Sequence, residues 1–375
     1  MKIIKADIIG IHLPLETPFI ISYATYDYMP SIIVKLETDD RLVGYGEAVP
    51  DEHVTGETFF STIEVLKHQL LPSIMGESPF AIEKIHHIME SRIHANPAAK
   101  AAIDIACYDL MGKYAGKPIY DLIGGKFHDK LTYAKVLSIE EPEIMAEKAK
   151  QAIAVGYSSL KLKVGFDLFK DLERMKAVRD AVGYEVPIRV DVNQGWKDYS
   201  TAAQALPLLE PLRISWLEQP IKIGDIDGLA ELRKKTVIPI MADESVHNGS
   251  DLNEIIKKNA ADKINIKLMK SAGIYPAIHM AKTAESAGIS CQVGSMVESS
   301  IGSAAGYHTA IARKNITSTE LTGPLLFSKD IGDLEYQIPF VLLSGKPGLG
   351  IEVNEDTLQE LTLKQETVQL GTIQS

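Results

Sequence analysis

Eight short apolar runs recur along residues 132–322, spaced about 20 to 30 residues apart. They read TYAKVL, SLKLKV, IRVDVN, SWLEQP, IPIMADE, KINIKLM, CQVGSM and ITSTELT. Helical stretches separate them, and strands that alternate with helical crossovers are typical of a parallel (β/α)8 barrel. The runs share no sequence repeat, so the pattern does not indicate a solenoid.

The residues before these runs follow another pattern. Up to about residue 50, apolar and polar residues alternate with a period of two, and SIIVKLET and RLVGYGEAV flank Asp39-Asp40 as a predicted hairpin. From Glu57 to Lys117 the pattern is helical, with Asn96 as the expected N-cap of a helix that begins at Pro97. Strands followed by helices favour a small α+β domain.

The tail of the chain resumes this mixed character. Residues 348–363, GLGIEVNEDTLQELTL, combine strand-like and helix-like stretches, so they are expected to return to the first domain. We therefore predict three parts within the 375 residues. They are an α+β capping domain over 1–125, a catalytic barrel over 126–325, and a C-terminal segment over 326–375 that joins the cap.

The composition limits the partners of the chain. A formal net charge of −11 argues against nucleic acid and anionic membranes, which bind surfaces with an excess of Lys and Arg. The N-terminal stretch has no signal-peptide pattern, and no uninterrupted apolar run reaches the ~18 residues of a membrane helix. These features predict a cytoplasmic location.

Polar residues interrupt the predicted barrel strands, and they lie late in each strand. Buried parallel strands are normally continuous apolar runs, so the exceptions call for a function. The C-terminal strand ends form the mouth of a barrel, where barrel enzymes place their chemistry. The interrupting residues are Lys161, Lys163, Asp191, Asn193, Glu218, Asp243, Glu244, Lys267 and Glu298.

Three of these carboxylates, Asp191, Glu218 and Asp243, come from adjacent strands and would repel one another unless a cation joined them. Oxygen ligands without His or Cys indicate Mg²⁺, with Mn²⁺ as a workable substitute. Any one of these acids alone is more simply explained as a helix N-cap or a loop carboxylate. Asn193 could lie beside the metal or in a turn, and Glu244 could cap a helix or orient Lys267.

Lys161 and Lys163 point to the same side of one strand, since strand side chains alternate faces. For an isolated Lys-x-Lys a solvated strand face is the simpler interpretation. At a barrel mouth, Lys163 and Lys267 would flank the metal and suit the removal and return of a proton α to a carboxylate. Burial, the cation and neighbouring Lys161 would disfavour the charged form of Lys163 and make it a usable base.

The stretch AAIDIACYDLMGKYAGKPIYDLIGG and the motifs KLKVG, VDVNQ, WLEQP, ADES and NIKLMKSAG occur in this order. Together they resemble the mandelate racemase/muconate-lactonizing branch of the enolase superfamily. The resemblance implies a modified TIM-type barrel under a cap built from both termini. It also implies Asp191, Glu218 and Asp243 as metal ligands and Lys163 and Lys267 as the acid/base pair. No His stands where the mandelate racemase type has its base, which favours the two-lysine subgroup.

The eighth strand bears on the substrate. Dipeptide-acting members of this subgroup have an Asp-x-Asp motif there, which holds a free ammonium group. The matching stretch here is STELTGP, in which Glu320 keeps one carboxylate and Thr322 replaces the second. A neutral amide nitrogen needs no counter-charge, so the sequence resembles an N-acylamino-acid racemase, with N-succinyl amino acids favoured.

The predicted reaction is a 1,1-proton transfer between the two lysines through a metal-stabilised enolate, with Lys161 helping to neutralise that enolate. Alternatives are a dipeptide (Ala-Glu type) epimerase, a muconate cycloisomerase, an o-succinylbenzoate synthase, or a barrel that only binds a ligand. Family habit also implies a homo-oligomer.

The sequence also suggests which residues contact the substrate and which lie on the surface. The capping loops YATYDYM and PDEHVTGE are expected to read the small-molecule carboxylate substrate. Lys263 and Lys270, and the pair His86-His87, are expected on the surface. Predicted substrate contacts are Tyr26, Ser295, Glu298, Glu320 and Thr322.

Overall fold

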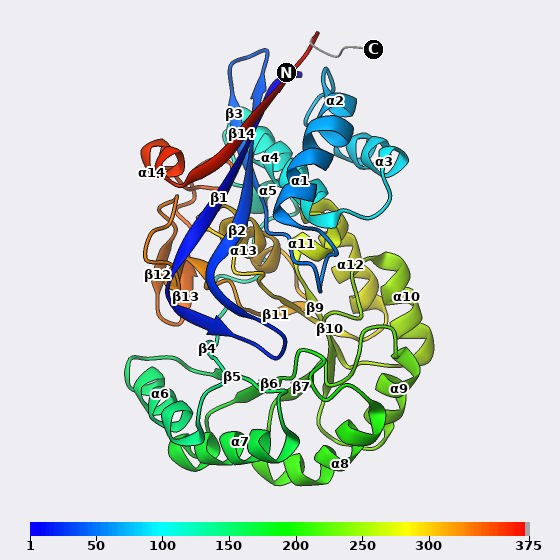
Figure 1. Ribbon diagram of the computed structural model, residues 1–375. Coiled ribbons are helices and arrows are strands. Elements are labelled where there is room, and N and C mark those ends of the chain that lie inside the picture. The colour runs from blue at the N-terminus through cyan, green and yellow to red at the C-terminus, as the bar shows by residue number, and fades with distance from the viewer. Residues whose placement is uncertain (372–375) are drawn as a thin grey trace.

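All eight predicted barrel runs form parallel strands of one sheet. The computed structural model describes residues 1–371, and every barrel strand lies beside its sequence neighbours (Figure 1). A parallel bridge between Tyr133 and Thr319 joins the segments of the first and last strands, so the sheet curls into the predicted barrel. The strands are β4 (Lys135–Leu137), β5 (Leu160–Lys163), β6 (Ile188–Asp191), β7 (Trp216–Glu218), β8 (Ile240–Ala242), β9 (Lys263–Ile266), β10 (Ser290–Val293) and β11 (Ile316–Thr319).

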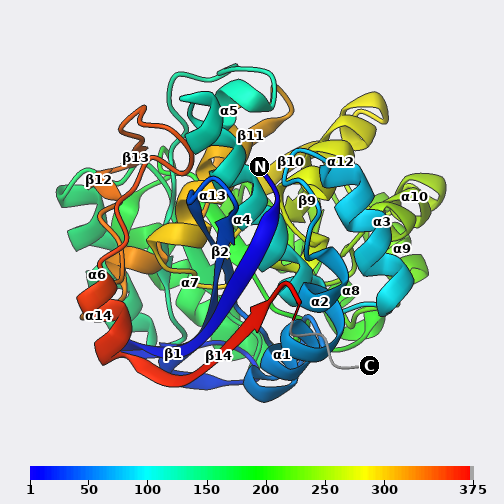
Figure 2. The same cartoon turned by 90° about the horizontal axis from the view of Figure 1, so that it is seen from above.

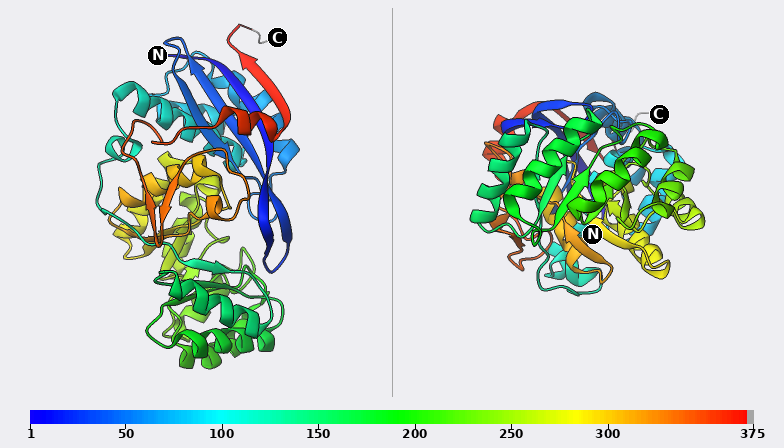
Figure 3. Two further views of the ribbon diagram at one scale, coloured as in Figure 1. Left: turned by 90° about the vertical axis from the view of Figure 1, so that its left-hand side faces the viewer. Right: turned by 90° about the horizontal axis from the view of Figure 1, so that it is seen from below.

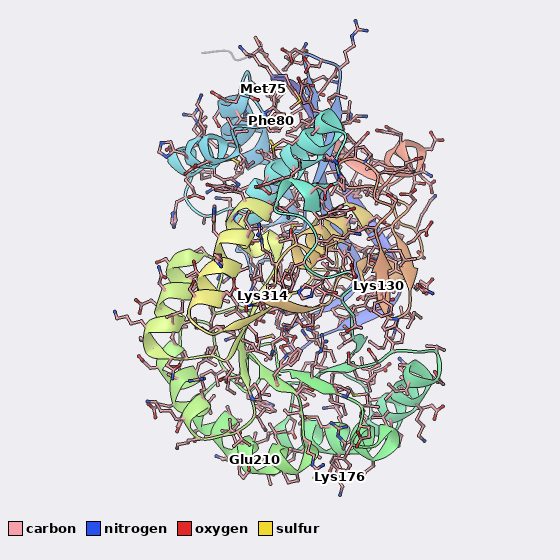
Figure 4. The ribbon with its side chains drawn as sticks, turned by 180° about the vertical axis from the view of Figure 1, so that it is seen from behind. Met75, Phe80, Lys130, Lys176, Glu210 and Lys314 are labelled. Atoms are coloured by element: carbon pink, nitrogen blue, oxygen red, sulfur yellow. The ribbon has the colours of Figure 1, made fainter. Side chains whose placement is uncertain are left out.

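Helices connect these strands on the outside of the barrel, as Figure 3 shows from the side and from below. Seen from behind in Figure 4, Lys176 and Glu210 lie on the outer rim, away from the cap, and both are exposed. The connecting helices are α6 (Pro142–Ala154), α7 (Leu168–Val182), α8 (Tyr199–Leu209), η2 (Glu210–Leu212), α9 (Ile226–Lys234), α10 (Gly249–Lys258), α11 (Leu268–Ser271), α12 (Ile274–Ser286) and α13 (Ser300–Ile311).

The cap is built on an antiparallel sheet with the order β14-β1-β2-β3 (Figure 2). The strands β1 (Ile3–Ile20), β2 (Thr25–Thr38) and β3 (Val43–Ala48) include the predicted hairpin around Asp39. The last strand, β14 (Thr362–Gln369), pairs with β1, so the chain end returns to the cap. Before it lie η3 (Gly323–Leu325), β12 (Glu335–Gln337), β13 (Phe340–Leu342) and α14 (Glu355–Glu360). The boundaries at residues 125 and 325 stay a prediction.

Helices cover one face of this sheet. The longest, α4, packs against β3 so closely that a Cβ on Gly46 would lie 1.8 Å from the carbonyl oxygen of Ala102. Only glycine allows this approach. The other helices of this layer are α1 (Phe59–Val65), η1 (Leu66–Leu70), α2 (Leu71–Ile74) and α3 (Ile82–Arg92), beside α4 (Pro97–Ala115). The short α5 (Ile119–Leu122) follows α4 and packs against α4 and the barrel helix α13.

The start of α4 differs in part from the prediction. The helix begins at Pro97, but Asn96 has a left-handed φ of 54° and its side chain makes no capping bond. The carboxylate of Glu57 accepts from the backbone N–H groups of Ala98 and Ala99 instead, at 2.9 and 3.0 Å. The carboxylate of Glu57, which is distant in sequence, therefore caps the N-terminus of α4 in place of the Asn96 side chain.

Two buried carboxylates of the cap bind the first turns of barrel helices. Glu47, on β3, accepts from the backbone N–H of Gly302 at 2.8 Å, at the start of α13. Asp104, on α4, accepts from the N–H of Ile274 at 2.5 Å, where α12 begins. The same Asp104 lies 2.7 Å from Nε2 of His86, which is buried, so the predicted surface position of His86 is wrong.

The cap also reaches over the barrel mouth. The loop between β1 and β2 extends toward the C-terminal ends of the barrel strands (Figure 1). There the hydroxyl of Ser22 donates to the backbone carbonyl of Asn193 at 2.7 Å. The polar strand ends are therefore enclosed between barrel and cap.

Candidate active site

Three buried carboxylates meet at the barrel mouth. Asp191 ends β6, Glu218 ends β7 and Asp243 directly follows β8, so the sheet order brings them together. One oxygen from each lies within 4.8 Å of the other two, and all three residues are fully buried. Glu218 Oε2 is buried without a hydrogen-bond partner in the described chain. A set of converging carboxylate oxygens with one unsatisfied acceptor fits a hard divalent cation.

Lys161 lies beneath this cluster and is not on a solvated strand face, because only 2% of it is exposed. Its Nζ is 2.9 Å from Asp191 Oδ2, 2.9 Å from Glu218 Oε1 and 2.8 Å from Glu320 Oε2. Burial alone would lower its pKa, but these carboxylates outweigh burial and hold the pKa well above its ordinary value. Lys161 is therefore a fixed positive charge inside the barrel.

Two further lysines stand at the ends of the carboxylate row. Lys163 Nζ lies 2.7 Å from Asp191 Oδ2 and 2.9 Å from Asn193 Oδ1. Lys267 Nζ lies 2.8 Å from Asp243 Oδ2. The sheet order puts β5 and β9 on either side of the three carboxylate strands, and both lysines line one cavity. A ligand in that cavity would meet an amine from each side.

Burial and the lysines pull the carboxylate pKa values in different directions. Burial raises the pKa of Asp191, but Lys161 and Lys163 outweigh burial and bring it below its usual range. Lys267 and Lys270 do the same for Asp243. Burial and then the neighbouring Asp191 raise the pKa of Glu218 well above its ordinary value. The two aspartates each lie within 3 Å of two lysines, whereas Glu218 pairs with Lys161 alone, which is why their pKa values shift in opposite directions.

The carboxylates also act on Lys267. Burial lowers its pKa, but Asp243 and Glu244 outweigh burial, so the pKa of Lys267 is raised. Free-base character at this lysine would need a competing cation on the same carboxylates.

Asn193 and Glu244 hydrogen-bond to each other behind the cluster. Asn193 Nδ2 donates to Glu244 Oε1 at 3.1 Å, and its own N–H donates to Asp191 Oδ1 at 3.0 Å. Burial, then Asp243 and Asp191, raise the pKa of Glu244 to about 7. Asn193 therefore links the buried Glu244 to Asp191, one of the three carboxylates of the cluster.

Four of the five predicted substrate contacts line the cavity beside the lysines. Glu298 is absent from that lining, and its Oε1 accepts from the N–H of Met296 at 2.9 Å. One oxygen of Glu320 is taken by Lys161, whereas Oε1 is buried without a partner in the described chain. The lining residues among the five are Tyr26, Ser295, Glu320 and Thr322.

Sequence reasoning misplaced two lysines and did not single out one carboxylate of the cavity. Lys270 is buried and bound to Asp243, so its predicted surface position is wrong. Lys263 is half-buried, with its Nζ 2.8 Å from Ser290 Oγ. Asp51, in the cap loop after β3, lines the cavity and accepts from Tyr26 Oη at 2.8 Å. The spacing of Lys270, one helical turn after Lys267, was a usable signal. Asp51 lies in the loop PDEHVTGE, which was expected to read the substrate, although the residue itself was not singled out.

Comparison with known families agrees with this arrangement. Residues 3–124 match the model of the mandelate racemase / muconate lactonizing enzyme N-terminal domain, and residues 144–357 match the enolase C-terminal domain-like model. The chain belongs to the mandelate racemase/muconate lactonizing enzyme family of the enolase superfamily. It is an isomerase of the racemase and epimerase type.

Among its relatives is an N-succinyl-L-Arg/Lys racemase of Bacillus cereus, 55% identical over 98% of this chain and 100% of that one. The crystal structure of that racemase superposes with a TM-score of 0.98. A hydrophobic dipeptide epimerase of Enterococcus faecalis is 41% identical over 94% of this chain and 99% of its own. A structure of the E. faecalis dipeptide epimerase with Mg and the dipeptide L-Leu-L-Tyr has a TM-score of 0.90.

Within residues 1–371, no helix has the length and apolar character that crossing a membrane requires.

Proposed function

We propose that the protein racemises N-succinyl amino acids, with preference for basic side chains. The proposal rests on the ion pair between Glu320 and Lys161, in which Glu320 Oε2 lies 2.8 Å from Lys161 Nζ. A carboxylate already neutralised in this way compensates a substrate ammonium poorly. Its free Oε1 is suited instead to accept from a neutral amide N–H, and Thr322 adds no second charge. The name of the 55% identical relative supports the succinyl group and the basic side chain.

The side-chain preference also has support within the cavity. Asp51 is buried and lies in the lining, beside Tyr26 at the start of β2; most of the stretch YATYDYM, expected to be a loop, is therefore strand. Its Oδ1 accepts from the N–H groups of His53 and Val54 at 2.8 and 2.9 Å, which fixes the carboxylate in place. A held carboxylate in a substrate cavity favours a guanidinium or ammonium group over an acidic side chain.

Asp191, Glu218 and Asp243 would hold Mg²⁺. The bound ion would supply electrostatic stabilisation of the charge that develops on the substrate carboxylate. The fit rests on the converging oxygens and on the unpartnered Oε2 of Glu218. The E. faecalis relative was crystallised with Mg.

Lys163 and Lys267 would act as the acid/base pair. One neutral amine removes the proton from Cα on one face, and the opposite ammonium returns a proton to the other face. Both lysines pair with carboxylates of the proposed ligand set, at 2.7 and 2.8 Å, so a cation sharing those oxygens would weaken the pairs and favour the neutral amine. Lys161, held as a cation by three carboxylates, would neutralise charge on the enolate.

The test is a comparison of substrates. N-succinyl-L-Lys or N-succinyl-L-Arg should be racemised with a kcat/KM at least ~10-fold above that of L-Ala-L-Glu, a margin of about 1.4 kcal/mol. Polarimetry and deuterium incorporation at Cα measure both reactions. A dipeptide turned over faster would favour the second candidate, a dipeptide epimerase, which the 41% identical relative supports.

Cycloisomerase activity is tested by the loss of cis,cis-muconate absorbance. A protein that binds these compounds without exchanging their Cα proton would be a ligand-binding barrel. The cytoplasmic location, the use of Mn²⁺ and a homo-oligomeric state stay predictions.

A further inference from the structure

A lysine that the reaction does not use lies behind the carboxylate row. Lys270 lies in the short helix α11 (Leu268–Ser271), one turn after Lys267, and only 2% of it is exposed. Its Nζ lies 2.6 Å from Asp243 Oδ1 and also donates to the backbone carbonyl of Asp243. Two more carbonyls, of Val246 and Asn265, accept from it at 3.1 Å each. A buried ammonium with four oxygen neighbours is fully satisfied and has no freedom to move.

These partners come from two neighbouring strands. Asp243 and Val246 lie in the loop after β8, and Asn265 lies on β9. Lys270 therefore ties the end of β8 to β9, the strand that directly precedes Lys267. A side chain that binds backbone on both sides fixes their relative position.

The two oxygens of Asp243 have different partners. Oδ1 faces Lys270, whereas Oδ2 meets Lys267 at 2.8 Å and Asn265 Nδ2 at 3.5 Å. Asn265 Nδ2 also donates to Glu218 Oε1 at 2.9 Å, so Oδ2 lies on the side of the carboxylate cluster. Rotation of the Asp243 carboxylate would break the contact with Lys270.

We propose that Lys270 is a positioning residue: it holds Asp243 Oδ1 so that Oδ2 stays turned toward Asp191 and Glu218 for a divalent cation. This inference rests on the metal site of the proposed function. Residues that hydrogen-bond to a metal ligand typically change metal affinity by about 10- to 100-fold when they are removed.

If Lys270 acted through its charge alone, its removal would change the metal affinity in the opposite direction. If Lys270 were only a nearby cation, its removal would leave the cluster more negative and a divalent cation would bind more tightly. If Lys270 positions Asp243, its removal leaves the carboxylate free to turn and the cation binds more weakly. The direction of the change separates the two roles.

The experiment titrates the chelator-treated full-length protein with Mn²⁺ and measures free Mn²⁺ by electron paramagnetic resonance. Lys270→Met removes the donors and keeps the length of the side chain. Lys100→Met is the matched control, because Lys100 is equally buried but contacts Glu90 and the carbonyl of Ile93, outside the cluster. Lys270→Gln, which retains a polar group, is the second variant should the Met variant not fold. Circular dichroism verifies folding of each variant.

The parent should bind one Mn²⁺ per chain, and Lys270→Met should raise the Kd at least ~10-fold while Lys100→Met leaves it within about twofold. Lys270→Gln should also raise the Kd, since its shorter amide cannot reach all the oxygens. Parental or tighter binding by a folded Lys270 variant overturns the positioning role. A parent that binds no Mn²⁺, or an Asp243→Asn variant that binds it as well as the parent, would instead refute the metal site of the proposed function.

Discussion

Acid should destabilise the fold through His308, a buried histidine that makes no hydrogen bond to the carboxylate cluster. His308 lies on α13, 1% exposed, and its Nε2–H donates to the carbonyl of Leu349 at 2.9 Å. Its Nδ1 accepts from the N–H of Tyr120 at 3.3 Å. A proton on Nδ1 would face another donor, so this arrangement requires the neutral ring.

Burial, only partly opposed by the bond to Leu349, lowers the pKa of His308 from 6.5 to about 4. In the unfolded chain the ring binds a proton near pH 6.5, so between these values the unfolded state holds more protons than the folded one. Stability is then complete above about pH 7 and is lost as the pH falls toward 4. At about 1.4 kcal/mol for each pH unit, the loss is about 2 kcal/mol at pH 5 and about 3 kcal/mol at pH 4.

The assay compares urea unfolding of the parent and of His308→Gln between about pH 7.5 and pH 5. The Gln amide can donate to Leu349 and accept from Tyr120 but does not titrate. The free energy of unfolding of the parent should therefore fall by about 2 kcal/mol more than that of the variant over this range. His87→Gln, on the exposed part of α3, controls for the substitution itself. Parallel profiles of parent and His308→Gln would refute the reasoning.

Three other changes test the fold and the site. Gly46→Ala should lower the free energy of unfolding by at least about 2 kcal/mol, measured in urea, because its Cβ would lie 1.8 Å from a backbone oxygen of α4. Lys163→Ala and Lys267→Ala should each stop racemisation but keep Cα deuterium exchange of one enantiomer, followed by NMR; parental racemisation by either would exclude the two-lysine mechanism. Exhaustive chelation should abolish activity and lower the Tm, and Mg²⁺ should restore both.

The barrel strands were predictable because their signal is local. Each is a short apolar run with turns or helices on both sides, and its polar residues lie at the end that forms the mouth. All eight runs form strands, and Asp191, Glu218 and Asp243 meet where the strand order places them. The mixed pattern of the tail indicated a return to the first domain but not a partner strand, and the structure shows that β14 pairs with β1.

The errors fall on charged groups whose partners are distant in sequence. His86 and Lys270 look like surface residues until Asp104 and Asp243 are brought beside them by the fold. Polarity predicts exposure only where no buried partner exists, and a single sequence does not show the partner. Asn96 fails as a cap for the same reason, since Glu57 supplies the acceptor from outside the helix.

Glu47 and Asp104, the two cap carboxylates that bind barrel helices, limit how substrate specificity can change. Glu47 and Asp104 belong to the cap, but they bind the N-termini of α13 and α12, which follow the barrel strands β10 and β9. Replacing the whole cap would remove acceptors from the N-termini of the barrel helices that follow Lys267 and Ser295 in the chain. The tip of the β1–β2 hairpin, residues 21–26, and the loop at residues 51–56 carry no such acceptor for these helices. They reach the cavity directly through Tyr26 and Asp51. Substrate preference can therefore diverge through these two segments, while the rest of the cap sheet and α4 stay bound to the barrel.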